Sequence, residues 1–307
     1  MAILILDGKT ALFGAKEGIS ICLQTVIPAL FPFFVLSGWL MGMAGGSRLL
    51  RPLGRLCRIP EGAEAVLIPA FLGGYPMGAA CVGTACRRGW LDRREGARLL
   101  AFCSNAGPAF LFGMLGPMFP RGWMVWSLWG IHVLGAILTA AVLPGGGGRA
   151  ALPDTPPSDG IMKGAVSAMA SVCGWVIFFR VVLAFLDRWV LWLLPLWAQV
   201  LGTGLLELIN GCLRLGYLES LSERYVFCSA FLAMGGLCVA LQTASVAGGL
   251  PMRSYFLGKA LQTGFSLLFS TGVVLGFWPV LLAISGLFLL ISPGIRKNSG
   301  KISEVGV

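Results

Sequence analysis

The sequence predicts an all-α polytopic membrane protein with two inverted repeats, re-entrant hairpins and broken transmembrane helices. Composition, the placement of arginine and a repeated order of apolar runs lead to this prediction. Hydrophobic residues make up 57% of the 307 residues and charged residues only 12%, against about 25% charged in an ordinary soluble domain. Mean hydropathy is +0.84. A soluble globule could not bury so much apolar surface, which excludes a soluble enzyme, a disordered chain and a secreted disulfide scaffold.

The net charge of +10 reflects basic residues in short loops between apolar runs, which is the positive-inside pattern of membrane proteins. We therefore expect the lipid bilayer, and no nucleic acid, as a partner. The chain has nine cysteines and one histidine, and no pair of cysteines is spaced as CxxC. Soft metal ligands do not converge in the sequence, so we expect neither a metal site nor a cofactor. The sequence leaves a homo-oligomer open.

The first hairpin is predicted between residues 63 and 86, because both of its flanks are rich in arginine. Four arginines recur at every third or fourth position of segment 47–59, with leucines between them, which indicates an amphipathic helix in the cytoplasmic interface. Five more arginines follow in 87–98. A full span would place one basic flank outside, whereas a re-entrant hairpin keeps both inside. Glycine and proline at 73–78 predict a helix break at its tip.

Further breaks are predicted inside apolar runs. Segment 97–118 is interrupted at 103–110, where glycine and proline cannot hold a regular helix. A second hairpin is interrupted around 207–212, and a second span around 234–243. Non-helical backbone at membrane depth is tolerated only where it is buried in protein or lines a cavity. These breaks therefore predict a shared internal cavity.

The second half repeats the order of the first: span, interfacial helix, broken hairpin, broken span and span. Three full spans in each half invert the second copy, and inverted repeats with discontinuous helices are the architecture of secondary transporters. Overlaying the halves places His132 near Gln262. The predicted segments are an N-terminal tail (1–17), repeat 1 (18–143, with interfacial helix 47–59 and hairpin 63–86), a cytoplasmic linker (144–161), repeat 2 (162–275, with interfacial helix 188–199 and hairpin 201–216), a last transmembrane helix (276–292) and a cytoplasmic tail (293–307).

Four motifs in this order resemble a known family. They are GGYPMGA (73–79), LLAFCSNAGPAF (99–110), LLELINGC (205–212) and AFLAMGGLCVALQ (230–242). The chain resembles the sporulation integral membrane proteins of the YlbJ type, which carry the nucleoside-recognition Gate domain, from about residue 15 to 290.

The resemblance implies a multi-pass protein of the cell membrane, or of the outer forespore membrane, that moves dipicolinic acid into the forespore. Gate domains also resemble concentrative nucleoside transporters, whose order of elements is the one described above. The polar hairpin triplet of those transporters, Gln-Thr-Glu, is absent here, because Gly73, Gly74 and Tyr75 occupy the first tip. This departure argues against a nucleoside and against sodium coupling.

The function predicted first is therefore a secondary transporter or facilitator of a small anionic metabolite. A nucleoside transporter and a non-transporting membrane scaffold in spore assembly remain alternatives. We do not expect an enzyme, because the sequence contains no Ser–His–carboxylate set, no HExxH and no Walker motif.

The candidate site follows from the breaks, since half-helix N-termini carry partial positive charge and free N–H donors that suit an anion. The candidate substrate-binding residues are Gly74, Tyr75, Ser104, Asn105, Glu207, Asn210 and Gln242. Ser104 and Asn105 can equally cap helix ends. Glu207 is costly in an apolar run, and is expected to be a proton site, a partner of Arg180 or an interfacial residue.

Arg180 and His132 complete the candidates for charge or proton coupling, together with Glu207. Arg180 lies near the outer end of its span, where it can attract the anion, pair with Glu207 or extend to the membrane interface. His132 lies in mid-span and is expected to be a neutral hydrogen-bonding group or a proton relay.

Overall fold

The computed structural model describes residues 7–43, 48–145, 150 and 160–303. Within these residues the chain is helical and forms no strand, which confirms the all-α prediction. Helices long and apolar enough to cross a membrane are Gly8–Leu36, Gly122–Val142, Ile161–Trp189 and Leu221–Val246. The chain is therefore a multi-pass membrane protein.

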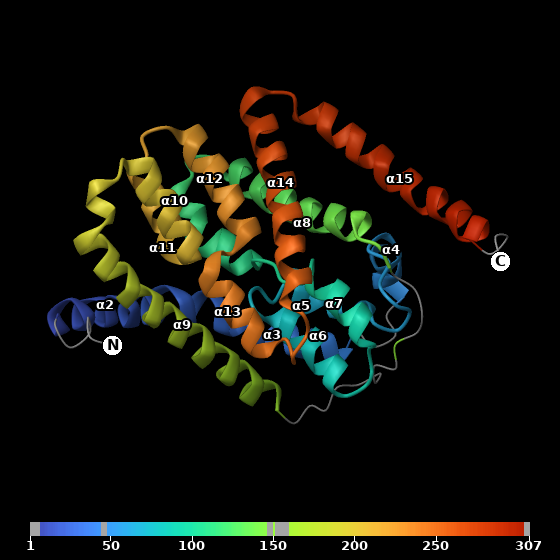
Figure 1. The fold of residues 1–307 in the computed structure, drawn as a ribbon, viewed down its shortest axis with the longest axis horizontal. Coiled ribbons are helices and arrows are strands. Elements are labelled where there is room, and N and C mark those ends of the chain that lie inside the picture. The colour runs from blue at the N-terminus through green and yellow to red at the C-terminus, as the bar shows by residue number, and fades with distance from the viewer. Residues whose placement is uncertain (1–6, 44–47, 146–149, 151–159, 304–307) are drawn as a thin grey trace.

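Non-α segments interrupt the helices in both halves of the chain, and the longest α-helices lie in the second half (Figure 1). The first half contains α2 (Gly8–Ile21), a π-helical segment (Cys22–Val26), α3 (Ile27–Met43), α4 (Arg51–Leu56), α5 (Leu67–Phe71), α6 (Met77–Arg87), α7 (Arg93–Leu100), a second π-helical segment (Ala109–Leu115) and α8 (Gly122–Val142). The second half contains α9 (Ile161–Trp189), α10 (Leu196–Leu206), α11 (Leu208–Arg214), α12 (Leu221–Met234), α13 (Gly236–Val246), α14 (Met252–Leu275) and α15 (Trp278–Ser303).

One end of the molecule is basic. The Arg98 guanidinium donates to the carbonyl oxygens of Cys57 (2.6 Å) and Arg58 (3.0 Å), which joins α7 to the segment after α4. Arg93 donates to the carbonyl oxygen of Gly249 at 2.7 Å, which brings the turn between α13 and α14 to the same end. The two arginine-rich flanks of the α5–α6 segment thus lie together, and the positive-inside rule assigns this end to the cytoplasm.

The opposite end carries exposed tryptophans. It contains the start of α8, the end of α9, the start of α10 and the start of α15, where Trp123, Trp126, Trp189, Trp192, Trp197 and Trp278 are exposed. Tryptophan gathers at the level of lipid headgroups, because its ring is apolar and its N–H is polar. These residues mark the outer membrane interface. α2 and α9 pack along each other between the two ends, and Asp7 and Arg188 pair at 3.2 Å at the outer end.

This arrangement predicts the result of a labelling experiment. Single cysteines introduced at Arg51 and Arg93 in a cysteine-free background should react with an impermeant maleimide from the same, cytoplasmic side. A cysteine at Ser220, which is exposed next to the outer end of α12, serves as the control and should react from the other side. Labelling of Arg51→Cys and Arg93→Cys from opposite sides would show that segment 63–86 crosses the membrane.

Several predicted boundaries are wrong. Residues 8–17 belong to α2 and are not a tail. The predicted interfacial helix 188–199 is not one helix, because α9 runs to Trp189 and α10 begins only at Leu196. Pro195 lacks the N–H that a continuous helix would need and becomes the N-cap of α10.

Other boundaries shift less. The first interfacial helix is shortened to a 3₁₀ turn at Arg48–Leu50 followed by α4, and Ser47 lies outside the described residues. α15 continues through the predicted boundary at 292, so the segment 293–303 is helical. Most of the linker 144–161 lies outside the described residues.

Candidate functional site

A small cavity inside the molecule is lined by residues from all four segments in which the sequence predicts a break. They include Tyr75, Gly107, Glu207 and Gln242. The cavity has a volume of about 40 Å³, which holds a few water molecules but no aromatic dicarboxylate. A ligand of that size would require the surrounding helices to move apart.

The first two breaks meet through glycine backbone. Gly74 has φ +75° at the turn between α5 and α6, in the left-handed region that glycine adopts most easily. A Cβ at Gly74 would lie 3.2 Å from the Gly107 nitrogen, and a Cβ at Gly107 would lie 3.0 Å from the Gly74 Cα. The tip of the α5–α6 segment and the break after α7 therefore approach so closely that a Cβ at either glycine would crowd the backbone of the other.

The break between α12 and α13 consists of Gly235 and Gly236, both with φ +76°. The sequence places Gln242 within this break, and that placement is wrong, because Gln242 lies on the regular helix α13. Its side chain is buried and still lines the cavity.

Glu207 separates α10 from α11 and is 1% exposed. Its carboxylate accepts hydrogen bonds from the backbone N–H groups of Ile209 (3.0 Å) and Asn210 (2.7 Å) and from the Asn210 side-chain amide (2.6 Å). It is thus the N-cap of α11. These three hydrogen bonds compensate part of the free-energy cost of removing the carboxylate from water.

Lys259 is the site residue that the sequence analysis missed. It lies on α14, is 3% exposed, and its ammonium donates to the Tyr75 hydroxyl (2.9 Å), to Gln262 Oε1 (2.9 Å) and to the Ser104 carbonyl oxygen. These acceptors match the three donors of a protonated lysine. Among the described residues, no carboxylate lies within ion-pair distance of it. A single lysine in the apolar run 255–275 was the signal available in the sequence.

Ser104, Asn105 and His132 hold the break after α7 together and do not line the cavity. Asn105 donates to the carbonyl oxygens of Ala70 (3.1 Å) and Phe102 (2.7 Å), and its Oδ1 accepts from Gln262 (2.9 Å). The Ser104 hydroxyl lies 3.3 Å from that of Thr243.

His132 Nε2 accepts a hydrogen bond from the backbone N–H of Ala106 at 3.0 Å. The proton of a neutral ring must then be on Nδ1. The His132 carbonyl oxygen accepts from Gln262 at 3.2 Å, so the two positions that the repeat overlay brings together are in contact.

The hydrogen bonds of Asn105 predict a loss of stability. Asn105→Ala removes two donors and one acceptor from buried partners, and each unsatisfied buried group costs about 1–3 kcal/mol. We therefore expect lower thermal stability of the purified protein in detergent. Asn210→Ala, in the first turn of α11, is a comparison from the second half of the chain. An unchanged melting temperature for Asn105→Ala would favour the direct ligand contact proposed from the sequence.

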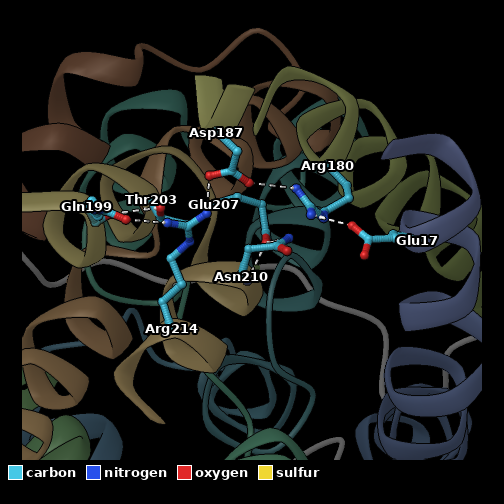
Figure 2. A network of polar contacts seen from close by, with 8 residues as sticks. All are labelled: Glu17, Arg180, Asp187, Gln199, Thr203, Glu207, Asn210 and Arg214. Atoms are coloured by element: carbon cyan, nitrogen blue, oxygen red, sulfur yellow. Dashed lines mark hydrogen bonds and ion pairs between the residues drawn. The ribbon is translucent and has the colours of Figure 1, made fainter. Parts of the chain in front are cut away.

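Arg180 does not pair with Glu207. It pairs with Glu17 of α2 and, at 3.4 Å, with Asp187 of α9. Arg214, which the sequence analysis did not single out, pairs with Asp187 and lies 3.4 Å from Gln199. Figure 2 shows these residues as one polar network that links α2, α9, α10 and α11.

A second cavity of about 330 Å³ lies beside this network and is lined by Glu17, Arg180, Asn210 and Arg214. Glu207 lines the first cavity and Asn210 the second, and the two side chains are hydrogen-bonded. The first turn of α11 therefore separates the central cavity from one that is closer to the outer end.

The described residues contain no group of three or more His, Cys, Asp or Glu side chains arranged to bind a metal. At the cytoplasmic end, burial raises the pKa of the Cys57 thiol to about 12, which keeps it protonated near neutral pH. A buried, protonated thiol is a poor nucleophile.

Comparison with curated proteins finds 35% identity over 104 residues with the sporulation integral membrane protein YlbJ of Bacillus subtilis (strain 168). The chain is similar to a sporulation membrane protein. The matched segment covers 32% of this chain and only 25% of the length of that relative. No protein-family model matches the chain. No solved structure matches it either.

Proposed function

We propose that this protein is a secondary transporter or facilitator of a small organic anion, with dipicolinic acid as the substrate that the family resemblance suggests. One observation carries the proposal: residues from all four predicted break segments line one internal cavity. A membrane scaffold has no need of irregular backbone at this depth, because each unpaired polar group there is costly. A transporter uses such backbone to hold its substrate.

We further propose that α5–α6 and α10–α11 are re-entrant hairpins of two inverted repeats in a Gate-type domain. The two ends of the α5–α6 segment lie at the basic end of the molecule, where Arg98 meets Cys57. Arg214, at the end of α11, pairs with Asp187 near the outer end of α9. Hairpins that enter from opposite sides are the arrangement expected of inverted repeats.

The charges beside the cavity support an anionic substrate. The Lys259 ammonium contacts the hydroxyl of Tyr75, a residue that lines the cavity, and its hydrogen-bond acceptors are all neutral. Glu207 lines the same cavity and would repel an anion while ionised. Uptake of a proton by Glu207 would remove that repulsion, so substrate and proton would bind together.

The proposal is tested by uptake into proteoliposomes that contain the purified protein. We expect accumulation of radiolabelled dipicolinate above protein-free liposomes and no accumulation of uridine. Uptake of uridine alone would identify a nucleoside transporter. Uptake of neither, from protein that is monodisperse and folded, would favour the scaffold.

A further inference from the structure

A third cavity lies at the cytoplasmic end, away from the central cavity. It has a volume of about 700 Å³ and is bounded by α7, the end of α8, and the segment from the α13–α14 turn into α14. Arg93, Arg94 and Arg98 contribute its basic side, and Leu143 and Leu257 are on its apolar side. Leu257 is 53% exposed, so this wall continues onto the lipid-facing surface of α14.

The arginines of this cavity differ in how they are held. Arg93 is fixed by its hydrogen bond to the Gly249 carbonyl oxygen. Arg98 is 7% exposed, and its two terminal nitrogens are used at Cys57, Arg58 and Glu95, but its Nε has no acceptor among the described residues. The exposed Arg94 side chain makes no hydrogen bond or ion pair within the described chain. The cavity thus offers unused donors and excess positive charge.

We propose that this cavity binds an anionic phospholipid of the cytoplasmic leaflet, with its phosphate at Arg93, Arg94 and Arg98 and an acyl chain along Leu257. Arginine pairs with phosphate through several N–H groups at once. Basic pockets between transmembrane helices on the cytoplasmic side are suited to anionic headgroups. A soluble phosphate would satisfy the arginines but would leave the apolar wall uncovered.

The position of the cavity gives the lipid a structural consequence. α7 belongs to the first half of the chain, whereas Gly249 and Leu257 belong to the second. A lipid held between them would reinforce the contact that Arg93 already makes across the halves. Binding should therefore raise the thermal stability of the protein, whether or not it transports anything.

The test is native mass spectrometry and thermal melting of the full chain in detergent supplemented with phosphatidylglycerol or with phosphatidylcholine. The wild type should retain phosphatidylglycerol and melt at a higher temperature with it. Arg93→Gln combined with Arg94→Gln should weaken retention about thirtyfold, since each arginine near a membrane surface contributes about fivefold. Arg51→Gln combined with Arg55→Gln is the matched control. It removes the same charge from exposed positions at the same end that do not line this cavity.

Three outcomes would overturn the proposal. Equal loss of phosphatidylglycerol in both double variants would show general attraction to a basic surface. Equal retention of phosphatidylglycerol and phosphatidylcholine by the wild type would show a site without charge recognition. Displacement of the lipid by millimolar glycerol 1-phosphate, with the same stabilisation, would show a site for a soluble phosphate.

Discussion

Replacing Glu207 by Gln should reduce uptake of dipicolinate in proteoliposomes to the level of protein-free liposomes, while the protein still inserts and folds. Glu207 lines the cavity beside Tyr75 and Gln242, and it is the carboxylate that lines this cavity. Gln keeps one oxygen that can accept from Asn210 but leaves the buried Ile209 N–H without an acceptor, so the loss at the helix cap should be about 1–3 kcal/mol. Gln cannot take up or release a proton, so the charge at position 207 can no longer change during a transport cycle.

The control for this variant is Glu219→Gln, which removes one carboxylate from an exposed position near the outer end. It should transport as the wild type does. Monodisperse elution and a melting temperature near that of the wild type would exclude misfolding of Glu207→Gln. Should Glu207→Gln transport normally at every pH, Glu207 is only the cap of α11. Proton coupling would then lie elsewhere, with His132 as the next residue to test.

The sequence was sufficient to predict an all-helical membrane protein and the segments whose residues line the central cavity, but not every helix boundary. Hydrophobic runs indicate the spans, arginine indicates the cytoplasmic end, and glycine with proline marks the breaks. Burial requires that freed backbone groups meet inside the protein, which is why Tyr75, Gly107 and Glu207 share one cavity. Gln242 lines the same cavity from the regular helix α13.

The partners of charged residues could not be predicted, because they depend on how helices are rotated against one another. The sequence offers Glu207 as one possible partner of Arg180, whereas in the structure Arg180 pairs with Glu17 and Asp187. For the same reason the sequence leaves Asn105 either in contact with a ligand or as a helix cap, whereas in the structure its donors are used at Ala70 and Phe102. A short polar side chain at a break is as well suited to holding the break as to binding a ligand.

Lys259→Met should abolish uptake of dipicolinate with little change in thermal stability. An ammonium at membrane depth costs about 2.5–3.5 kcal/mol on insertion scales, and Met removes this cost. The same change leaves the Ser104 carbonyl oxygen and Gln262 Oε1 without their donor, at about 1–3 kcal/mol for each buried group. The two effects have opposite signs and similar size, so they should nearly cancel in the free energy of unfolding.

The loss of transport should be much larger than the change in stability, because Met removes the positive charge that balances a bound anion. Lys259 does not line the cavity but is hydrogen-bonded to Tyr75, which does, so we expect it to act as a positioning residue whose charge is felt at the site. Lys259→Arg keeps the charge and should retain part of the uptake, while Lys259→Gln, which keeps hydrogen bonding but no charge, should behave like Met.

The ranking of uptake among these three variants distinguishes an effect of charge from an effect of packing. If Lys259 were only structural, uptake in the three variants would follow their melting temperatures, and Gln, which replaces some of the lost hydrogen bonds, would outperform Met. Uptake that instead follows charge, measured at several imposed membrane potentials, would show that the ammonium sets the electrostatics of substrate binding. Full activity of Lys259→Met would contradict this role and would leave the anion to the backbone N–H groups of the breaks.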